Sequence, residues 1–361
     1  MGSLGISVFL GMGQSTAENA EYLAMASRYG YQRVFTSLHI PEADHDTIIS
    51  ECKEVLRKAK KLGFEVTADI SPISWKLLGL QPENLKEFGI DIVRADWGFS
   101  PEQLLDLMNR SGLRLEINAS TMTEALLKNI LASGFSPANL CAGHNYYPRP
   151  ETGLSYILFA ERSRCLNAYG IPVAAFIPGK SSKRGPIYAG LPTLEEHRVM
   201  PTVESVRQLW ASGYVDTILF GDPLATEEEL AAVAALPREM PELMMLMVQD
   251  AAKPEFGAGA MWAKRHTNRL DASACVVRSQ ESREMKWSEI VPQPNAVPRR
   301  RGDITVDNSL FGRYAGEMQI VLRDLPADAR VNVVGRIIPE DLCLLDCLEP
   351  GRCFCLKEAL E

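Results

Sequence analysis

Carboxylate, amide, imidazole, hydroxyl and cationic side chains recur after short apolar runs in the first two thirds of the 361-residue sequence. A functional site could be built from them. The set comprises Ser37, His39, Glu42, Asp69, Arg94, Asp96, Glu116, Asn118, His144, Asn145, Lys180 and Asp222. Many carboxylates without a dense histidine or cysteine set suit acid/base chemistry at a sugar centre better than transition-metal catalysis. We therefore expect Asp69, Asp96 and Glu116 to supply an acid/base or nucleophile pair, without a metal or cofactor. Glu42 is the reserve carboxylate.

Spacing along the chain pairs some of these side chains. Side chains alternate along a β-strand, so Arg94 shares a face with Asp96. Glu116 likewise shares a face with Asn118. The structural alternative is an ion pair of Arg94 with Asp96 or with Glu116. Carboxylates on neighbouring strands, about 4.8 Å apart, would suit a retaining glycosidase, whereas Asp69 and Glu116, two strands apart, would suit an inverting one.

The segment HNYYPRPETGL (144–154) gathers several groups that bind ligands. His144 alone is weak evidence, because a lone histidine after a strand is more often structural than catalytic. Tyr146 and Tyr147 can pack the loop or offer an aromatic face to a sugar ring. Arg149 stands between two prolines, which restrict its backbone, so we expect it to bind a phosphate or carboxylate. The residues expected to orient the sugar are Asn118, His144, Asn145 and Tyr147, with His39 and Arg94 also on the rim.

The elements that must position these groups alternate regularly. Eight short apolar runs, each followed by a polar turn and a stretch of helical periodicity, occupy residues 5 to about 236. They are GISVFL (5–10), RVFTSL (33–38), EVTADI (65–70), DIVRAD (91–96), RLEINA (114–119), ANLCAG (138–143), PVAAFI (172–177) and VDTILF (215–220). This alternation is typical of a (β/α)8 TIM barrel, whose working residues lie at the C-terminal ends of the strands.

A doubly wound open sheet is the competing interpretation. The G-x-G at Gly11–Gly13 would favour it, but the full G-x-G-x-x-G spacing is missing and a tight turn between strand and helix accounts for these glycines. The first helical stretch should begin after Ser15 as N-cap and stop at Gly30 in a left-handed conformation. The second should end at Gly63 after a basic last turn.

The pattern changes after about residue 240. Alternating strands such as CVVRS (275–279), RGDITVDN (301–308), GEMQIVLRDL (316–325) and RVNVVGRII (330–338) replace the helices. We therefore predict a barrel domain over residues 1–240 and a mostly β domain over residues 241–361, with the join between Pro237 and Pro254.

Composition narrows the partners. A net charge of −8 and a pI near 5.4 argue against a nucleic-acid or anionic-membrane surface, although a local basic pocket can still bind a small anion. The start MGSLGISVFLGMG has no basic leader, so we expect a cytoplasmic protein. Eight scattered cysteines fit a reducing compartment. The last four have C-x3-C-x5-C-x-C spacing without paired C-x2-C knuckles, and DLCLLDCLEPGRCFCL suggests apolar strand packing, not zinc.

A family resemblance rests on longer segments. They are GISVFLG, TSLHIPE, RADWG, INAS, HNYYPRPETGLS, HTNRLDASACVVRS and GDITVDNSLFGRYAGEMQI. Over nearly its whole length the sequence resembles the bacterial 6-phospho-N-acetylmuramidase family, once catalogued as a domain of unknown function. The resemblance implies a barrel followed by a cyclophilin-like domain, and cytosolic hydrolysis of the bond between 6-phospho-N-acetylmuramic acid and N-acetylglucosamine. It assigns no catalytic residues, so those above come from barrel position.

The implied substrate is a phosphorylated amino-sugar disaccharide with two anions, a 6-phosphate and a lactyl carboxylate. The cations expected to meet them are Arg149, Lys180, Arg283 and Arg313. The substrate's acetamido group also allows substrate-assisted attack. Two other functions stay open: a phosphosugar lyase or isomerase with Lys180 as Schiff base, and a partner-binding protein using the β domain. A homo-oligomer is compatible with each of them.

Overall fold

The computed structural model describes residues 2–38, 45–71, 81–95, 99–238, 241–247, 265–284 and 289–359. The chain divides into two compact units. The first comprises Met1–Leu209 and Gly213–Pro237, and the second comprises Trp210–Ser212 and Arg238–Glu361.

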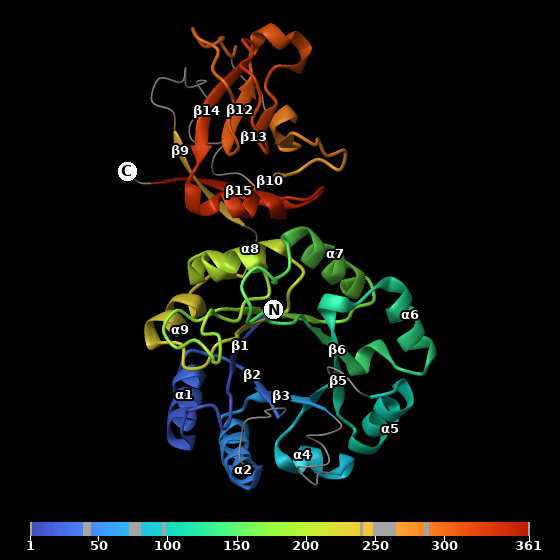
Figure 1. Cartoon of the computed structure of the whole chain (residues 1–361). Helices are drawn as coiled ribbons and strands as arrows, with labels where there is room; N and C mark the ends of the chain where they lie inside the picture. The colour runs from blue at the N-terminus through green and yellow to red at the C-terminus, as the bar shows by residue number, and fades with distance from the viewer. Residues whose placement is uncertain are drawn as a thin grey trace. The chain divides into compact units, whose positions relative to one another are not determined.

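The first unit is a closed barrel of eight parallel strands in sequence order (Figure 1). The strands are β1 (Ser3–Ser7), β2 (Arg33–Ser37), β3 (Glu65–Ile70), β4 (Ile92–Ala95), β5 (Arg114–Asn118), β6 (Leu140–Gly143), β7 (Val173–Ile177) and β8 (Thr217–Phe220). Each falls within or overlaps a predicted run, so the predicted barrel is confirmed. The open-sheet alternative is wrong, because β1 pairs with β8 and closes the ring.

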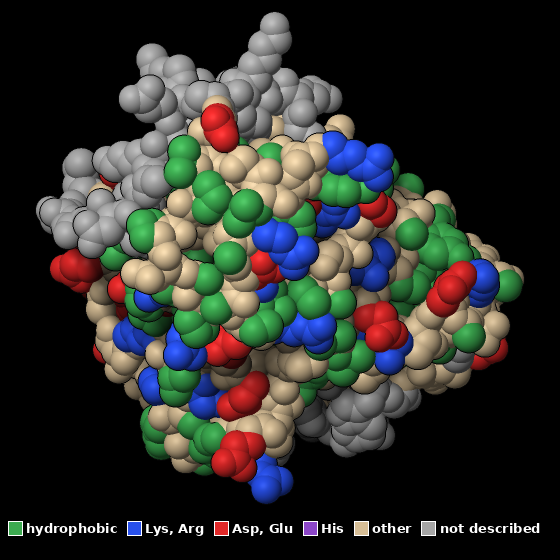
Figure 2. Space-filling view, turned by 90° about the horizontal axis from the view of Figure 1, so that it is seen from above, with side chains coloured by type: hydrophobic (Ala, Val, Ile, Leu, Met, Phe, Trp, Pro, Cys, Tyr) green, Lys and Arg blue, Asp and Glu red, His purple; other side chains and the backbone are tan. Residues whose placement is uncertain are grey.

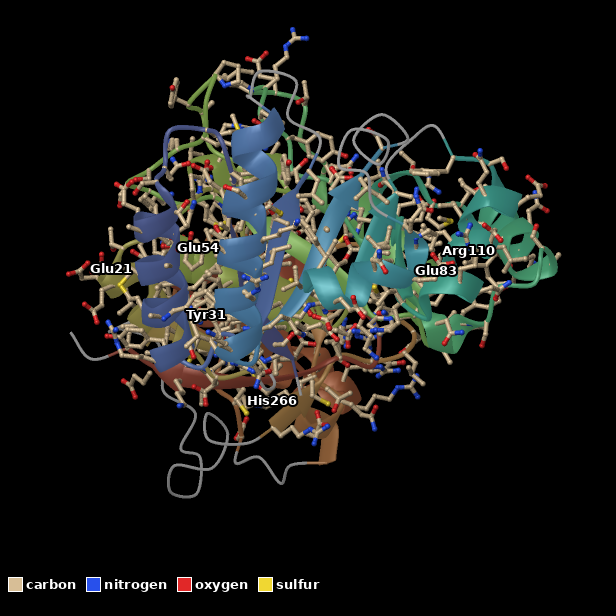
Figure 3. The ribbon with its side chains drawn as sticks, turned by 90° about the horizontal axis from the view of Figure 1, so that it is seen from below. Glu21, Tyr31, Glu54, Glu83, Arg110 and His266 are labelled. Atoms are coloured by element: carbon tan, nitrogen blue, oxygen red, sulfur yellow. The ribbon has the colours of Figure 1, made fainter. Side chains whose placement is uncertain are left out.

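Helices surround the strands (Figure 1). They are α1 (Thr16–Arg28), α2 (His45–Lys61), η1 (Pro82–Asn84), α4 (Leu85–Phe88), α5 (Pro101–Ser111), η2 (Ala119–Thr121), α6 (Glu124–Ala132), η3 (Pro137–Asn139), α7 (Tyr156–Asn167), η4 (Glu195–Arg198), α8 (Thr202–Ser212) and α9 (Glu227–Ala234). The segment between α1 and β2 also contacts the last helix of the ring, because the Tyr31 hydroxyl donates to the Leu230 carbonyl of α9 at 3.1 Å (Figure 3 labels Tyr31).

The predicted helix ends are present. Ser15 caps α1 through a capping box with Glu18, which satisfies backbone N–H groups that the first turn leaves free. Gly30 and Gly63, with φ of 77° and 84°, take the left-handed conformation expected just beyond α1 and α2. Gly11 and Gly13 also have positive φ, which fits the tight turn after β1.

Two kinds of core fill the barrel unit. Between strands and helices, apolar side chains such as Leu115, Leu140 and Leu166 pack together. Inside the barrel the filling is uneven. Aromatic and aliphatic side chains from β2, β7 and β8 and from the segments that follow β1 and β7 form one cluster, with Phe35 and Phe176 in ring contact. The strands β2 to β5 contribute charged side chains instead, and these lead to the mouth.

The second unit is built on a seven-stranded sheet of order β10-β15-β9-β14-β12-β13-β11, in which only β9 and β15 are parallel neighbours. Its elements are β9 (Glu242–Met247), β10 (Arg265–Thr267), β11 (Val276–Arg278), η5 (Glu281–Glu284), β12 (Asp303–Asp307), η6 (Ser309–Tyr314), β13 (Met318–Val321), β14 (Val331–Ile337), η7 (Pro339–Cys347) and β15 (Cys353–Glu358). The predicted mostly β character is confirmed.

Two details of this unit differ from the sequence interpretation. Residues assigned to the join, ELMMLM, form β9, because alternation of buried side chains was hidden by a continuous apolar run. Cys343 and Cys347 lie on the 3-10 helix η7, so only Cys353 and Cys355 belong to a strand. Across the described residues of both units, no helix has the length and apolar character needed to cross a membrane. Acidic and basic side chains are interspersed over the face shown in Figure 2.

Candidate functional site at the barrel mouth

Several predicted site residues cannot be placed at the mouth. His39, Glu42 and Asp96 lie outside the described residues, and so does the side chain of Arg283. Arg313 belongs to the second unit, where its guanidinium donates to the hydroxyl of the neighbouring Tyr314 at 2.6 Å and lies over that ring. The site is therefore built from the remaining residues, all on the barrel.

Arg94 and Glu116 form a buried ion pair inside the barrel. Their side chains keep 5% and 4% of their exposure, and Arg94 Nη1 donates to Glu116 Oε1 at 2.9 Å. The guanidinium also donates to the Gly143 carbonyl at 3.0 Å and to Asn145 Oδ1 at 2.6 Å. A Cβ on Gly143 would lie 2.5 Å from Arg94 Nη1 and still closer to Glu116 Oε1, so glycine makes room for the pair. The ion pair considered from sequence is confirmed.

Glu116 extends from this pair toward the N-terminal ends of the strands. Its other oxygen lies 3.9 Å from Arg33 Nη2. Arg33 also pairs with Glu65 at 3.1 Å, and Glu65 pairs with Arg114. Charges of alternating sign therefore run through the barrel interior up to Arg94. Glu116 is enclosed within this series, a position in which it holds Arg94 in place.

Asp69 lies at the mouth with a partly exposed side chain. It is in register with Ser37 on β2 and with Arg94 on β4. Ser37 Oγ donates to Asp69 Oδ2 at 3.4 Å. The pKa of Tyr146 is raised, mainly by burial and also by the negative charge of Asp69. Among the described residues, Asp69 is the predicted catalytic carboxylate with a partly exposed side chain at the mouth.

His144 does not join the mouth. It is fully buried, with Nε2 2.9 Å from Ser163 Oγ and Nδ1 3.2 Å from Ser120 Oγ, and its ring lies 4.9 Å from that of Phe159 on α7. Burial, and then the charge of Arg94, lower its pKa to about 3, so the imidazole is neutral. His144 follows the parity of Leu140 and Ala142, which face the helices. The structure thus gives it a packing position between β6 and α7.

The amide side chains anchor the loops after β5 and β6. Asn118 Oδ1 accepts the backbone N–H of Ser120 at 3.0 Å and caps η2. Ser120 Oγ in turn accepts the backbone N–H of Asn145 at 2.8 Å. The side chain of Asn145, unlike that of His144, points into the barrel, where its Oδ1 accepts a hydrogen bond from Arg94. Both predicted amides, Asn118 and Asn145, lie near the strand ends, and their described hydrogen bonds hold the loops and Arg94 in place.

A pair that sequence interpretation missed holds the HNYYPRPETGL loop. Arg198 donates from Nε and Nη2 to the two oxygens of Glu195 at 2.6 and 2.8 Å, and from Nη1 to the Gly190 carbonyl at 3.0 Å. This Arg198–Glu195 pair bonds the main-chain atoms Tyr147 O (2.9 Å), Arg149 O (3.2 Å), Glu151 N (2.8 Å) and Gly153 N (2.7 Å). Arg198 and these N–H groups lower the pKa of Glu195 to about 2. The side chain of Tyr147 is half-buried and that of Arg149 is exposed.

The loop after β7 is organised by Asp222. This buried carboxylate accepts the backbone N–H groups of Gly179, Arg184 and Leu191, each at 3.0 Å. Lys180, the predicted cation of this loop, donates from Nζ to the Met200 carbonyl at 2.6 Å. Burial, and then the charge of Lys183, lower the pKa of Lys180. The lysine is thus directed to the start of α8.

Arg184 is the cation that this loop delivers to the mouth. Its guanidinium lies over the rings of Phe9 and Tyr146, with centroid distances of 4.7 and 4.9 Å, and Nη1 donates to the Tyr146 hydroxyl at 2.9 Å. The basic segment KSSKRG after the seventh strand could have predicted a cation here, because barrels often bind phosphate at the loops after strands seven and eight.

A separate pocket of about 250 Å³ lies between η1 and α5. Its lining includes Asp106 and Arg110, and Arg110 pairs with Glu83 at 2.8 Å (Figure 3 labels Glu83 and Arg110). The lining residues come from η1, from α5 and from the segments that precede these helices. Among the described residues, no group of three or more potential metal ligands occurs.

Fold and site together define a (β/α)8-barrel protein with a polar mouth, followed by a β-sheet unit. Residues 4–235 match the N-terminal model of 6-phospho-N-acetylmuramidase, and residues 244–357 match the C-terminal model. The chain belongs to the 6-phospho-N-acetylmuramidase family.

Two solved structures resemble the whole chain. An uncharacterized Bacillus cereus protein is 33% identical, with 99% of each chain covered and a TM-score of 0.77. A conserved Enterococcus faecalis protein of unknown function is also 33% identical, with 99% of this chain and 96% of that chain covered and a TM-score of 0.60. A search of curated proteins gave no significant match.

Proposed function

We propose that this protein is a glycoside hydrolase that cleaves 6-phospho-N-acetylmuramic acid from N-acetylglucosamine during the recycling of cell-wall sugars in the cytosol. Family membership supports the reaction, and the barrel mouth supports it chemically. The observation that carries the proposal is the partly exposed Asp69 beside the buried Arg94–Glu116 pair. This arrangement combines an accessible carboxylate with fixed polar groups at the end of a barrel where catalysis takes place.

The side chains then divide the work. Asp69 exchanges a proton with the glycosidic oxygen or attacks the sugar, and Asp96, two residues beyond Arg94 in the sequence, is proposed as the second carboxylate. Glu116 holds the Arg94 guanidinium from below. Asn145, which Arg94 fixes by its Oδ1, orients its amide N–H groups toward a sugar hydroxyl. Tyr147 offers a half-buried aromatic face.

The direct test compares two substrates. Purified full-length protein is incubated with the 6-phosphorylated disaccharide and with the same disaccharide lacking the phosphate, and released N-acetylglucosamine is measured. We expect release from the phosphorylated form, and a kcat/KM lower by about 10- to 100-fold on the other, because a charged hydrogen bond is lost. No release from the phosphorylated form would remove the proposal.

A further inference from the structure

Arg184 has unused hydrogen-bonding capacity at the mouth. Nη1 is occupied by the Tyr146 hydroxyl, but the buried Nε has no hydrogen-bond partner within the described residues. None of the described carboxylates forms an ion pair with this guanidinium. An enclosed donor on a charged group is costly unless a ligand or water satisfies it.

The guanidinium is also held in a fixed place. Phe9 and Tyr146 stack against it, and its own backbone N–H is bound by Asp222. Two aromatic faces and an anchored main chain reduce the entropy that the side chain loses on binding. Lys183, half-buried one residue before, adds positive charge to the loop.

We infer that Arg184 binds an oxyanion of the sugar substrate, an inference that rests on the proposed function. The edge of a guanidinium presents parallel N–H groups that match two oxygens of a phosphate or a carboxylate. Tyr146 links the guanidinium to the catalytic region, because its hydroxyl accepts from Arg184 and its ring lies 5.9 Å from that of Phe35, which stands two residues before the Ser37 that bonds Asp69. An anion on Arg184 would therefore fix the sugar ring beside Asp69. Arg149 is exposed and Lys180 is bound to a carbonyl, so Arg184 is the better prepared cation.

The test measures binding without turnover, by calorimetric titration of the full-length protein with four monosaccharides. N-acetylglucosamine 6-phosphate carries only the phosphate, N-acetylmuramic acid only the carboxylate, N-acetylmuramic acid 6-phosphate both, and N-acetylglucosamine neither. In Arg184→Gln we expect the dissociation constant to rise about 10- to 100-fold for the ligands that carry the recognised anion. The phosphate-only and carboxylate-only ligands identify the source. Arg184→Lys, which keeps the charge without the planar edge, should give a smaller loss.

Arg110→Gln is the matched control, because Arg110 is an arginine of the outer pocket and its loss should leave all four dissociation constants unchanged. Unchanged binding in Arg184→Gln, equal weakening that includes neutral N-acetylglucosamine, or wild-type protein that binds none of the anionic sugars would overturn the inference. If sugar binding depends on Arg184 but the disaccharide is not hydrolysed, only the proposed function is overturned. If the disaccharide is hydrolysed but Arg184→Gln does not change sugar binding, only this inference is overturned.

Discussion

Burial separates the acidic residues of the barrel into different roles. Asp69 is partly exposed at a strand end, whereas Glu116 keeps 4% of its side-chain exposure and faces Arg94 and Arg33. A carboxylate that exchanges protons with a substrate must be able to reach it, as Asp69 can. A carboxylate between two guanidinium groups, such as Glu116, is suited to hold those groups in place.

Asp69→Asn should lower kcat on the phosphorylated disaccharide by about 10²- to 10⁴-fold with little change in KM, because general acid/base catalysis contributes about that much. Ser37→Ala is the matched control, since it removes a 3.4 Å bond to the same carboxylate and leaves the carboxylate itself in place, and we expect less than a tenfold effect. Steady-state kinetics measure both. Full activity in Asp69→Asn would exclude this carboxylate.

His144 makes the barrel sensitive to acid. Its pKa falls from 6.5 to about 3 on folding, so between these values the unfolded chain binds a proton that the folded chain does not. Stability is therefore complete above pH 6.5 and decreases as the pH falls, by up to about 1.4 kcal/mol for each pH unit. His144→Asn should have a shallower fall between pH 7 and pH 5 in denaturant titrations. Parallel curves for the two proteins would contradict the neutral buried imidazole.

At the scale of elements, the two loops that frame the mouth depend on one ion pair. Arg198 and Glu195 bind main-chain atoms of the loop after β6 from within the loop after β7. Asp222 fixes the base of that second loop. The position of Arg184 therefore depends on contacts far from it in the sequence.

Arg198→Ala should destabilise the barrel by about 2 kcal/mol or more, because charged hydrogen bonds are lost and carbonyl groups lose their donor. It should also weaken sugar binding, since both loops lose their connection. Lys128→Ala removes an exposed i,i+4 partner of Glu124, and solvent screening makes such a pair weak, so the free energy of unfolding should change little. Denaturant unfolding compares the two. Equal losses of unfolding free energy in the two variants would show that the Arg198–Glu195 pair contributes no more to stability than an exposed ion pair does.

The elements themselves were predictable from local patterns, and the depth and direction of side chains were not. Periodicity and turn residues mark all eight strands, and the Ser15 cap is visible in the sequence. The prediction for His144 failed to use strand parity, which continues from Leu140 and Ala142 toward the helices. The depth of Glu116 depends on how neighbouring strands are staggered, which one sequence does not show. Arg184 was missed because the choice among three cations in KSSKRG depends on tertiary contacts.

At the scale of the whole molecule, two units carry separate cores and separate titratable groups. The second unit buries Asp307 near Glu317, and burial, followed by repulsion from Glu317, raises the pKa of Asp307 to about 7. The unfolded carboxyl has its ordinary value of 3.8. Between these values the folded unit binds the additional proton, so its stability falls as the pH rises from about 4 to 7.

Asp307→Asn should therefore raise the melting temperature of the second unit at pH 8, with little gain at pH 4, because the amide needs no buried charge. Differential scanning calorimetry should show two transitions, since units with their own cores need not unfold together. Only one should respond to Asp307→Asn, and only the other to His144→Asn. A lower melting temperature for Asp307→Asn at pH 8 would contradict the raised pKa.

The Arg198–Glu195 pair touches the HNYYPRPETGL loop only at carbonyl and N–H groups in the bonds described above. Such bonds do not read side-chain identity, but they do require a fixed number of residues between the first and the last anchor. The residues between Tyr147 and Gly153 can therefore exchange side chains during evolution, whereas an insertion or deletion among them would break the attachment. Gly153 itself is restricted, because a Cβ there would lie 2.6 Å from Glu195 Oε2.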